Sequence, residues 1–423
     1  MRRRYRVWGD ALHLAYALVT VAVTSATAYA APQNDTLSAP RVPSDREKSS
    51  FILETMRGGG IPGLQTVVIK NGKVVWHHSY GYSVLAPPGP RKSMRDDSLL
   101  FSASVAKMIT VTAVMQQVEK GRISLDDDIN KYLPFAIRNP KWPDVPITWR
   151  MLLTHTSSID VDQSVEDSVY FYGDDNPITL EEYVEGMFIP GGRYFRADSF
   201  RAGRPGTERI YSDNAFDVVG YALARVVKQP FAEYVHDAIL VPLQMKESAY
   251  SLRKIPADKL SVGYGRTLGV DGKWHFASAR VAYAHLPDGR TVMDDQMGIP
   301  DPPSGGLFTS ATQFARLLLM FLNHGALDGA KVLEPSSVDL LTTHTGYFSI
   351  FGYQQGLALM GARDLDDHLV WGHDGQDRGY CTAAYFDRAS GVVVVAFANA
   401  NRDDELLSRR LVDLDMHMLD WFK

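Results

Sequence analysis

The stretch that decides the fold is LQTVVIKNGKVVWHHSYGY, residues 64–82. Leu64 to Ile69 and Val74 to Tyr82 are rich in β-branched and aromatic residues, and Asn71-Gly72 lies between them. An Asn-Gly pair between two such runs is the strongest short-range signal of a β-hairpin, because both residues tolerate the positive φ angles of its turn. The sequence therefore predicts two antiparallel strands near the start of the folded chain.

A second group of predicted strands lies near the end of the sequence. Leu369 to Gly372, Tyr380 to Phe386 and Val392 to Phe397 have strand-like composition, and residues 387–391 are typical of a turn. A closing helix is predicted from about Asp403. We expect the two ends of the chain to share one sheet.

The residues between these groups favour helices. Apolar residues recur at helical spacing and stop before Gly121, a candidate C-cap: Val105, Met108, Val111, Met115 and Val118. Further helices are predicted at 147–153, 215–227, 231–239 and 311–323. Two long segments, 160–207 and 254–304, look irregular and are either substrate walls or exposed linkers.

Because the chain lacks βαβ alternation, this pattern predicts an α/β fold of the α+β type. Its central antiparallel sheet, formed by N-terminal and C-terminal strands, is flanked by helices. A mainly helical sub-domain, about residues 105–300, is inserted into the sheet domain. We expect a cleft between the two parts.

Composition and charge exclude several classes of protein. With 423 residues the chain is too long for a single core, and 45% hydrophobic residues argue against disordered and multi-span membrane proteins. The 44 basic and 49 acidic residues include no long basic run after the first six residues, which makes nucleic acid a poor partner. The lone Cys381 allows no internal disulfide, and no local motif predicts a metal site.

The N-terminus has the pattern of a secretory signal. Four arginines within residues 2–6 precede the apolar stretch Ala11 to Val23, and Ala28-Tyr29-Ala30 is a candidate cleavage site. An uncleaved anchor is the alternative, but the stretch is shorter than the ~20 apolar residues that span a bilayer. We predict a signal peptide at 1–30 cut after Ala30, a flexible leader at 31–45 and a folded domain at 46–423. This predicts a periplasmic or secreted protein without stable membrane insertion.

One motif indicates nucleophilic chemistry. Ser104-Val105-Ala106-Lys107 lies at the predicted start of an amphipathic helix, so the hydroxyl and the amine fall one turn apart on one face. A lysine acts as base for such a serine only if burial or nearby positive charge lowers its pKa. The alternative is an N-cap serine beside a surface lysine. A second match at Ser251 to Lys254 is followed by Pro256 and is discarded.

Two further motifs contribute candidate residues. Tyr211-Ser212-Asp213 supplies a phenol that can relay protons if nearby cations hold down its pKa, although a core tyrosine is the alternative. His373-Asp374-Gly375 lies at the C-terminal strands, where a strand edge can align a substrate and lend a backbone N–H to an oxyanion hole. Similar triplets at Tyr385 and His344 are better explained as a strand residue and a helix end.

With Ser104, Lys107, Tyr211 and His373-x-Gly375 in this order, the sequence resembles the serine β-lactamase-related family. That group includes class C β-lactamases, D-alanyl carboxypeptidases and secreted esterases. The resemblance implies a β-lactamase/transpeptidase-like fold and a hydrolase that forms an acyl-enzyme on Ser104, without a cofactor. It also implies that Lys107 and Tyr211 manage the proton of the serine. The backbone N–H groups of Ser104 and Gln376 would form the oxyanion hole.

Two departures from the family pattern bear on the substrate. Asp213 replaces an asparagine, and its carboxylate is expected to hold Lys107 cationic and shift proton transfer toward Tyr211. His373 replaces the usual lysine and weakens the fixed cation that would hold a substrate carboxylate. Both favour a small-molecule ester or amide as substrate.

Two other functions stay open at this stage. One is a D-alanyl carboxypeptidase, D-aminopeptidase or β-lactamase acting on cell-wall-type substrates. The other is a non-catalytic, penicillin-binding-like sensor that retains the fold. The sequence predicts no oligomeric state.

Overall fold

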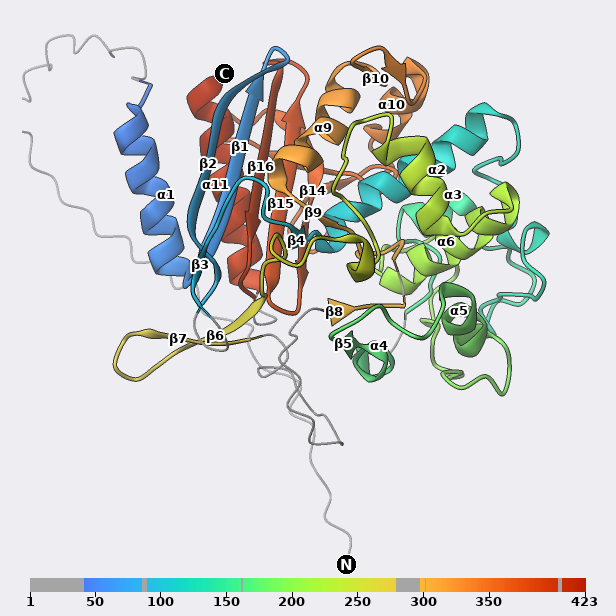
Figure 1. Ribbon diagram of the computed structural model, residues 1–423. Coiled ribbons are helices and arrows are strands. Elements are labelled where there is room, and N and C mark those ends of the chain that lie inside the picture. The colour runs from blue at the N-terminus through green and yellow to red at the C-terminus, as the bar shows by residue number, and fades with distance from the viewer. Residues whose placement is uncertain (1–41, 86–89, 161–162, 279–296, 301, 402–404) are drawn as a thin grey trace, which may run out of the picture. The chain divides into compact units, whose positions relative to one another are not determined.

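The computed structural model describes residues 42–85, 90–160, 163–278, 297–300, 302–401 and 405–423 (Figure 1). The predicted signal peptide and most of the predicted leader lie outside these ranges. The central element is an eight-stranded antiparallel sheet in the order β12-β13-β14-β15-β16-β1-β2-β3. Its strands are β12 (Gln354–Gln355), β13 (Met360–Arg363), β14 (Leu369–Asp377), β15 (Tyr380–Asp387), β16 (Val392–Ala398), β1 (Gly63–Lys70), β2 (Lys73–Val84) and β3 (Lys92–Ser93).

The predicted hairpin and the shared sheet are both confirmed. β1 and β2 pair antiparallel, and Asn71 and Gly72 between them have φ angles of 50° and 76°. β1 also pairs with β16, so the N-terminal hairpin and the C-terminal strands lie side by side in one sheet. The predicted α+β architecture is therefore the observed one.

Both faces of the sheet are covered by helices. α1 (Asp45–Gly59) and α11 (Glu405–Phe422) lie on one face, and α9 (Ala311–Leu322) packs on the other (Figure 1). In β16, Val393 and Val395 point into the core that contains α9, whereas Val394 points into the core under α11. Because both faces are buried, β16 is apolar at every position and lacks the alternation of a half-exposed strand.

The helices of the middle of the chain gather around α2 (Lys107–Glu119), which follows the 3₁₀ turn η1 (Ala103–Ala106). Every side chain from Lys107 to Gln117 is buried. The prediction of an amphipathic helix here is wrong, because helical neighbours surround α2 and a helix buried on all sides needs no polar face. Those neighbours include α6 (Asp213–Val227), α7 (Phe231–Val235) and the π-helical turn η3 (His236–Leu240). Gly121, with φ of 66°, ends the segment.

The two segments predicted to be irregular contain regular elements, which corrects that prediction. The first holds α4 (Gln163–Val169), β5 (Phe171–Tyr172) and α5 (Leu180–Phe188), and the second holds the hairpin β6 (Tyr264–Leu268) and β7 (Trp274–Ser278). β5 pairs with β8 (Met297–Gly298), which joins the two segments. The remaining elements are β4 (Leu100–Phe101), η2 (Ile129–Lys131), α3 (Trp149–Leu153), η4 (Leu252–Lys254), β9 (Phe308–Thr309), β10 (Ala326–Leu327), β11 (Ala330–Lys331) and α10 (Pro335–Leu341).

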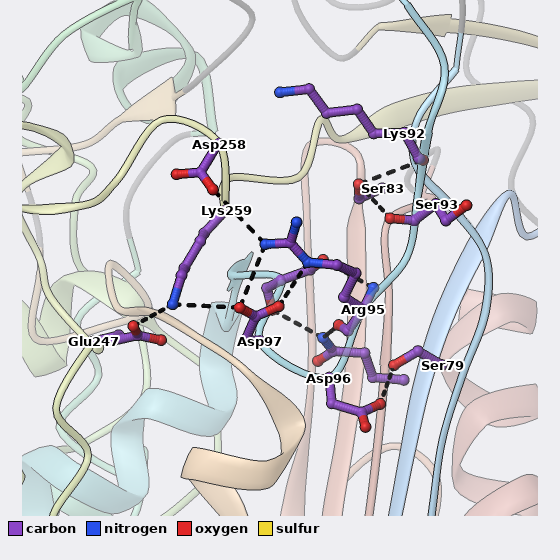
Figure 2. A network of polar contacts seen from close by, with 12 residues as sticks. Ser79, Ser83, Lys92, Ser93, Arg95, Asp96, Asp97, Glu247, Asp258 and Lys259 are labelled. Atoms are coloured by element: carbon purple, nitrogen blue, oxygen red, sulfur yellow. Dashed lines mark hydrogen bonds and ion pairs between the residues drawn. The ribbon is translucent and has the colours of Figure 1, made fainter.

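A polar network attaches the segment between β3 and β4 to the segment that precedes β6 (Figure 2). Arg95 donates from Nε to Asp97 at 2.8 Å, and Lys259 forms ion pairs with Asp97 at 3.3 Å and with Glu247. The backbone N–H of Leu99 donates to the carbonyl of Lys259 at 2.8 Å. The ion pairs are partly exposed and individually weak. Together with this backbone bond, they fix the entry to β4, the strand that leads to Ser104.

Candidate active site

Ser104 lies in the tight turn η1, which is held from two sides. The backbone N–H of Ser102 donates to Leu307 O at 2.8 Å, and Thr382 Oγ1 of β15 donates to Ser102 O at 2.8 Å. Ala103 adopts φ of 49°, a left-handed conformation that is uncommon for a residue with a side chain. The surrounding hydrogen bonds hold this strained residue directly before Ser104, whose side chain is half-buried.

β14 approaches the same turn so closely that one of its residues must be glycine. A Cβ atom on Gly375 would lie 2.8 Å from the backbone nitrogen of Ser104 and 2.6 Å from Thr382 Oγ1. Contacts this short are not tolerated, so any larger residue would push β14 away from Ser104. Gln376 follows on the same strand and is exposed. The structure thus brings the strand end predicted to line the site onto the candidate nucleophile.

Lys107 is the first residue of α2, and its ammonium group has three acceptors. Nζ donates to Ser104 Oγ at 3.0 Å, to the carbonyl of Ser304 at 2.6 Å, and to the carboxylate of Asp213. The side chain is fully buried. Burial alone would lower the pKa of Lys107, but the carboxylate of Asp213, together with the interaction with Tyr211, outweighs it and raises this pKa above its usual value. Lys107 is therefore a cation at neutral pH, as expected from Asp213.

Tyr211 precedes α6, whose N-terminus is capped by Ser212 through a 3.1 Å hydrogen bond from the backbone N–H of Ala215. The Tyr211 side chain interacts with both Lys107 and Ser104, yet 38% of its surface is exposed. Burial of the phenol raises the pKa of Tyr211 to about 12, although Lys107 lowers it. Lys107 favours loss of the phenol proton, as the relay predicted from the sequence requires, but desolvation outweighs this effect. Tyr211 is a neutral phenol in the resting site.

His155 holds the Tyr211 segment in place and was not singled out from the sequence. Its Nδ1 accepts the backbone N–H of Ser212 at 3.1 Å, and its carbonyl accepts the N–H of Ile210 at 2.7 Å. Its ring stacks on Tyr211 with 4.3 Å between centroids. Burial, together with nearby positive charge, lowers the pKa of His155 well below its usual value, so the ring is neutral. In the sequence, His155 follows the helix predicted at 147–153, and this position in a loop is the signal that could have identified it.

His373 lies on β14 on the same side as Gly375, with its ring centroid 6.3 Å from that of Tyr211. It is 2% exposed, and burial and the charge of Lys107 lower its pKa to about 3. His373 is thus neutral, as expected, and supplies no fixed cation. Its Nδ1 is hydrogen-bonded to the carbonyl of Asp374, and its Nε2 has no partner among the described residues.

The discarded motifs lie away from this group. Ser251 precedes the 3₁₀ turn η4 and donates to Asp175 at 2.6 Å, and Tyr385 is buried inside β15. His344 follows α10, as expected for a helix end. In the described part of the chain, no group of three or more His, Cys, Asp or Glu side chains is arranged to bind a metal. Within the same ranges, no helix has the length and apolar character needed to cross a membrane.

The comparison with known families decides the relationship. The profile described as Beta-lactamase matches residues 49–415 of this chain. The chain belongs to the beta-lactamase family. Among solved structures, it is similar to the D-amino acid amidase of Ochrobactrum anthropi, with a TM-score of 0.67 and 19% identity over 89% of this chain and 98% of the amidase.

Two curated proteins are similar to this chain in sequence, each over only part of its own length. Protein flp of Staphylococcus aureus strain MW2 is 26% identical over 366 residues, which are 85% of this chain and 64% of flp. The beta-lactamase family chain described here thus spans just under two thirds of flp. The D-alanyl-D-alanine-carboxypeptidase/endopeptidase AmpH of Escherichia coli strain K12 is 29% identical over 194 residues, 46% of each chain.

Proposed function

We propose that this protein is an exported serine hydrolase that cleaves a small ester or amide through an acyl-enzyme on Ser104. One observation carries the proposal: Ser104 Oγ lies 3.0 Å from Lys107 Nζ, in a half-buried turn whose backbone nitrogen faces the β14 edge at Gly375. A nucleophile, a proton-transfer group and a strand edge thus meet at one point.

The proposed reaction has two halves. Ser104 Oγ attacks the substrate carbonyl and passes its proton to the Lys107–Tyr211 group, which has lost one proton beforehand, and the backbone N–H groups of Ser104 and Gln376 stabilise the oxyanion. The bond to the leaving group then breaks, and the leaving alcohol or amine takes up a proton. Water attacks the acyl-enzyme and gives a proton to the same group, which passes a proton to Ser104 Oγ as the acyl–oxygen bond breaks, and the acid is released. The side chains present suffice for every step, so no cofactor is proposed.

The resting protonation states shape the proton transfer. Lys107 is cationic and Tyr211 is neutral, so neither is a ready base at neutral pH. We propose that the site becomes active when the Lys107, Tyr211 and Asp213 group loses one proton. Tyr211, whose side chain is partly exposed, then passes a proton to the leaving group. Activity should accordingly rise with pH above neutrality.

Because His373 is neutral, it offers no positive charge to hold a substrate carboxylate at that position. This supports a small ester or amide as the substrate. The fold shared with a D-amino acid amidase is consistent with amide cleavage. We propose a small molecule as the partner and propose neither nucleic acid nor stable membrane insertion. N-terminal sequencing of the exported protein tests the location: the sequence should begin at Ala31.

A side-by-side assay tests the proposed function. The mature protein and its Ser104→Ala variant are incubated with a short chromogenic ester and with a chromogenic cephalosporin. We expect ester cleavage that is lost in the variant, with an unchanged melting temperature. Comparable cleavage of the cephalosporin would instead favour the alternative function, a hydrolase that acts on cell-wall-type substrates. A protein that is acylated once but never turns over would be a sensor, and ester cleavage that survives Ser104→Ala would rule the proposal out.

A further inference from the structure

Arg209 lies two residues before Tyr211 and extends toward the edge of the sheet. Its Nε donates to Gln355 Oε1 of β12 at 2.6 Å, and its Nη2 lies 4.0 Å from Met360 Sδ of β13. Its guanidinium carbon is 5.8 Å from the centroid of the Tyr211 ring. The guanidinium group therefore lies between the Tyr211 segment and the strands that continue the sheet beyond β14.

The charge of Arg209 has no counter-ion in the described part of the chain. No carboxylate there lies within 4.0 Å of it, whereas Arg150, Arg253 and Arg388 each form such a pair. The side chain is half-buried, and burial lowers its pKa, although an arginine stays charged at any ordinary pH. A desolvated charge without a partner is unfavourable, which suggests that its partner is a ligand.

The guanidinium lies beside the reaction centre, next to the Tyr211 ring. Its positive charge lowers the pKa of both His373 and His155, the two buried imidazoles beside Tyr211. His373 also leaves Nε2 without a partner among the described residues. Asp374 attracts Arg209 only at longer range and is itself hydrogen-bonded to Ser408. Nε is bonded to Gln355 and Nη2 makes only a long contact with Met360 Sδ, so the remaining Nη hydrogens can bind an anion.

We propose that Arg209 binds a carboxylate of the substrate, so that preferred substrates are esters or amides with a carboxylate close to the scissile bond. This inference rests on the proposed function and narrows its substrate class. One guanidinium beside a neutral histidine supplies a single positive charge, which matches a planar monoanion better than a dianionic phosphate. Arg209 would thus supply the cation that His373 does not.

Binding to a protein that cannot turn over separates this inference from the proposed function. In the Ser104→Ala background, calorimetry measures Kd for N-acetyl-D-alanyl-D-alanine and N-acetyl-L-alanyl-L-alanine, each as free acid and as C-terminal carboxamide. The acid of at least one pair should bind more tightly, and Arg209→Gln should reduce its preference over the amide by roughly 10- to 100-fold. Arg209→Lys should retain part of the preference, and Arg150→Gln, which also removes one positive charge, should retain all of it.

Two results would overturn the inference. One is the absence of any acid preference in both pairs with the arginine intact, a comparison that needs no substitution at 209 and therefore no refolding control. The other is an acid preference that is unchanged in Arg209→Gln. Neither result depends on whether Ser104 is a nucleophile, because no turnover is measured.

Discussion

Asp213→Asn should move the pH dependence of the reaction to lower pH. The carboxylate of Asp213 raises the pKa of Lys107, and it also raises the pKa of Tyr211. Asparagine keeps the shape and the acceptor oxygen but removes the charge. Both pKa values should therefore fall, so the form that has lost one proton should become populated at lower pH than in the unmodified protein.

The size of the shift follows from the contact between the two charges. Unit charges about 4 Å apart interact by about 4 kcal/mol at an effective dielectric constant of about 20, which corresponds to about 3 pKa units. Lys107 is fully buried, but the Asp213 side chain is 34% exposed, so solvent screens part of this interaction. We expect a shift of about 1 to 3 pH units after screening.

The assay is the pH profile of kcat/KM for a neutral chromogenic ester, compared between the protein and Asp213→Asn. Because the raised pKa values keep Lys107 and Tyr211 protonated, the unmodified protein should gain activity as pH rises above neutrality. The rising limb of the variant should lie at lower pH. Asp339→Asn is the control, because it removes a carboxylate of α10 that pairs with Arg388 at 2.7 Å. A rising limb that stays in place, or moves to higher pH, would refute the proton assignment.

Three substitutions test other parts of the structure. Gly375→Ala should lower kcat/KM by roughly 100-fold, because a methyl group 2.8 Å from the Ser104 nitrogen displaces β14, and unchanged kinetics would contradict that geometry. His155→Phe keeps a ring beside Tyr211 but leaves the Ser212 N–H without an acceptor, so urea unfolding should show a loss of about 1–3 kcal/mol. Val395→Ala removes two buried methyl groups from the sheet core and should lower the free energy of unfolding by about 1–3 kcal/mol. The folded fraction should keep its kcat, and a loss of kcat in fully folded protein would argue against a purely structural role.

Local signals explain most of what the sequence predicted about the fold. Asn71-Gly72 specifies its own turn, and the continuous apolar run of β16 is explained by burial on both faces. The helices α1 and α5 were missed, although each begins with a capping box, formed by Ser44 with Glu47 and by Thr179 with Glu182. Their capping boxes are visible in the sequence, but apolar periodicity alone does not reveal them.

Within the candidate site, the contact between Ser104 and Lys107 was predictable from spacing alone, because its geometry is local. Ser104 and Lys107 are three residues apart, so a helical turn brings their side chains together whatever the rest of the fold does. The positions of Gly375 and Arg209 depend on how strands distant in sequence pack, which no spacing specifies. The direction of the Tyr211 pKa shift could not be predicted from the sequence, because the extent of burial is a property of the tertiary structure.

Labelling with a fluorophosphonate, a reagent that reacts with activated serines, tests the central claim most directly. One equivalent should react, peptide mass spectrometry should locate it on Ser104, and turnover should disappear in proportion to the label. The Ser104→Ala variant should remain unlabelled under the same conditions. A protein that hydrolyses esters while Ser104 stays unmodified, or that loses activity through a label on another residue, would contradict the assignment of Ser104 as the nucleophile.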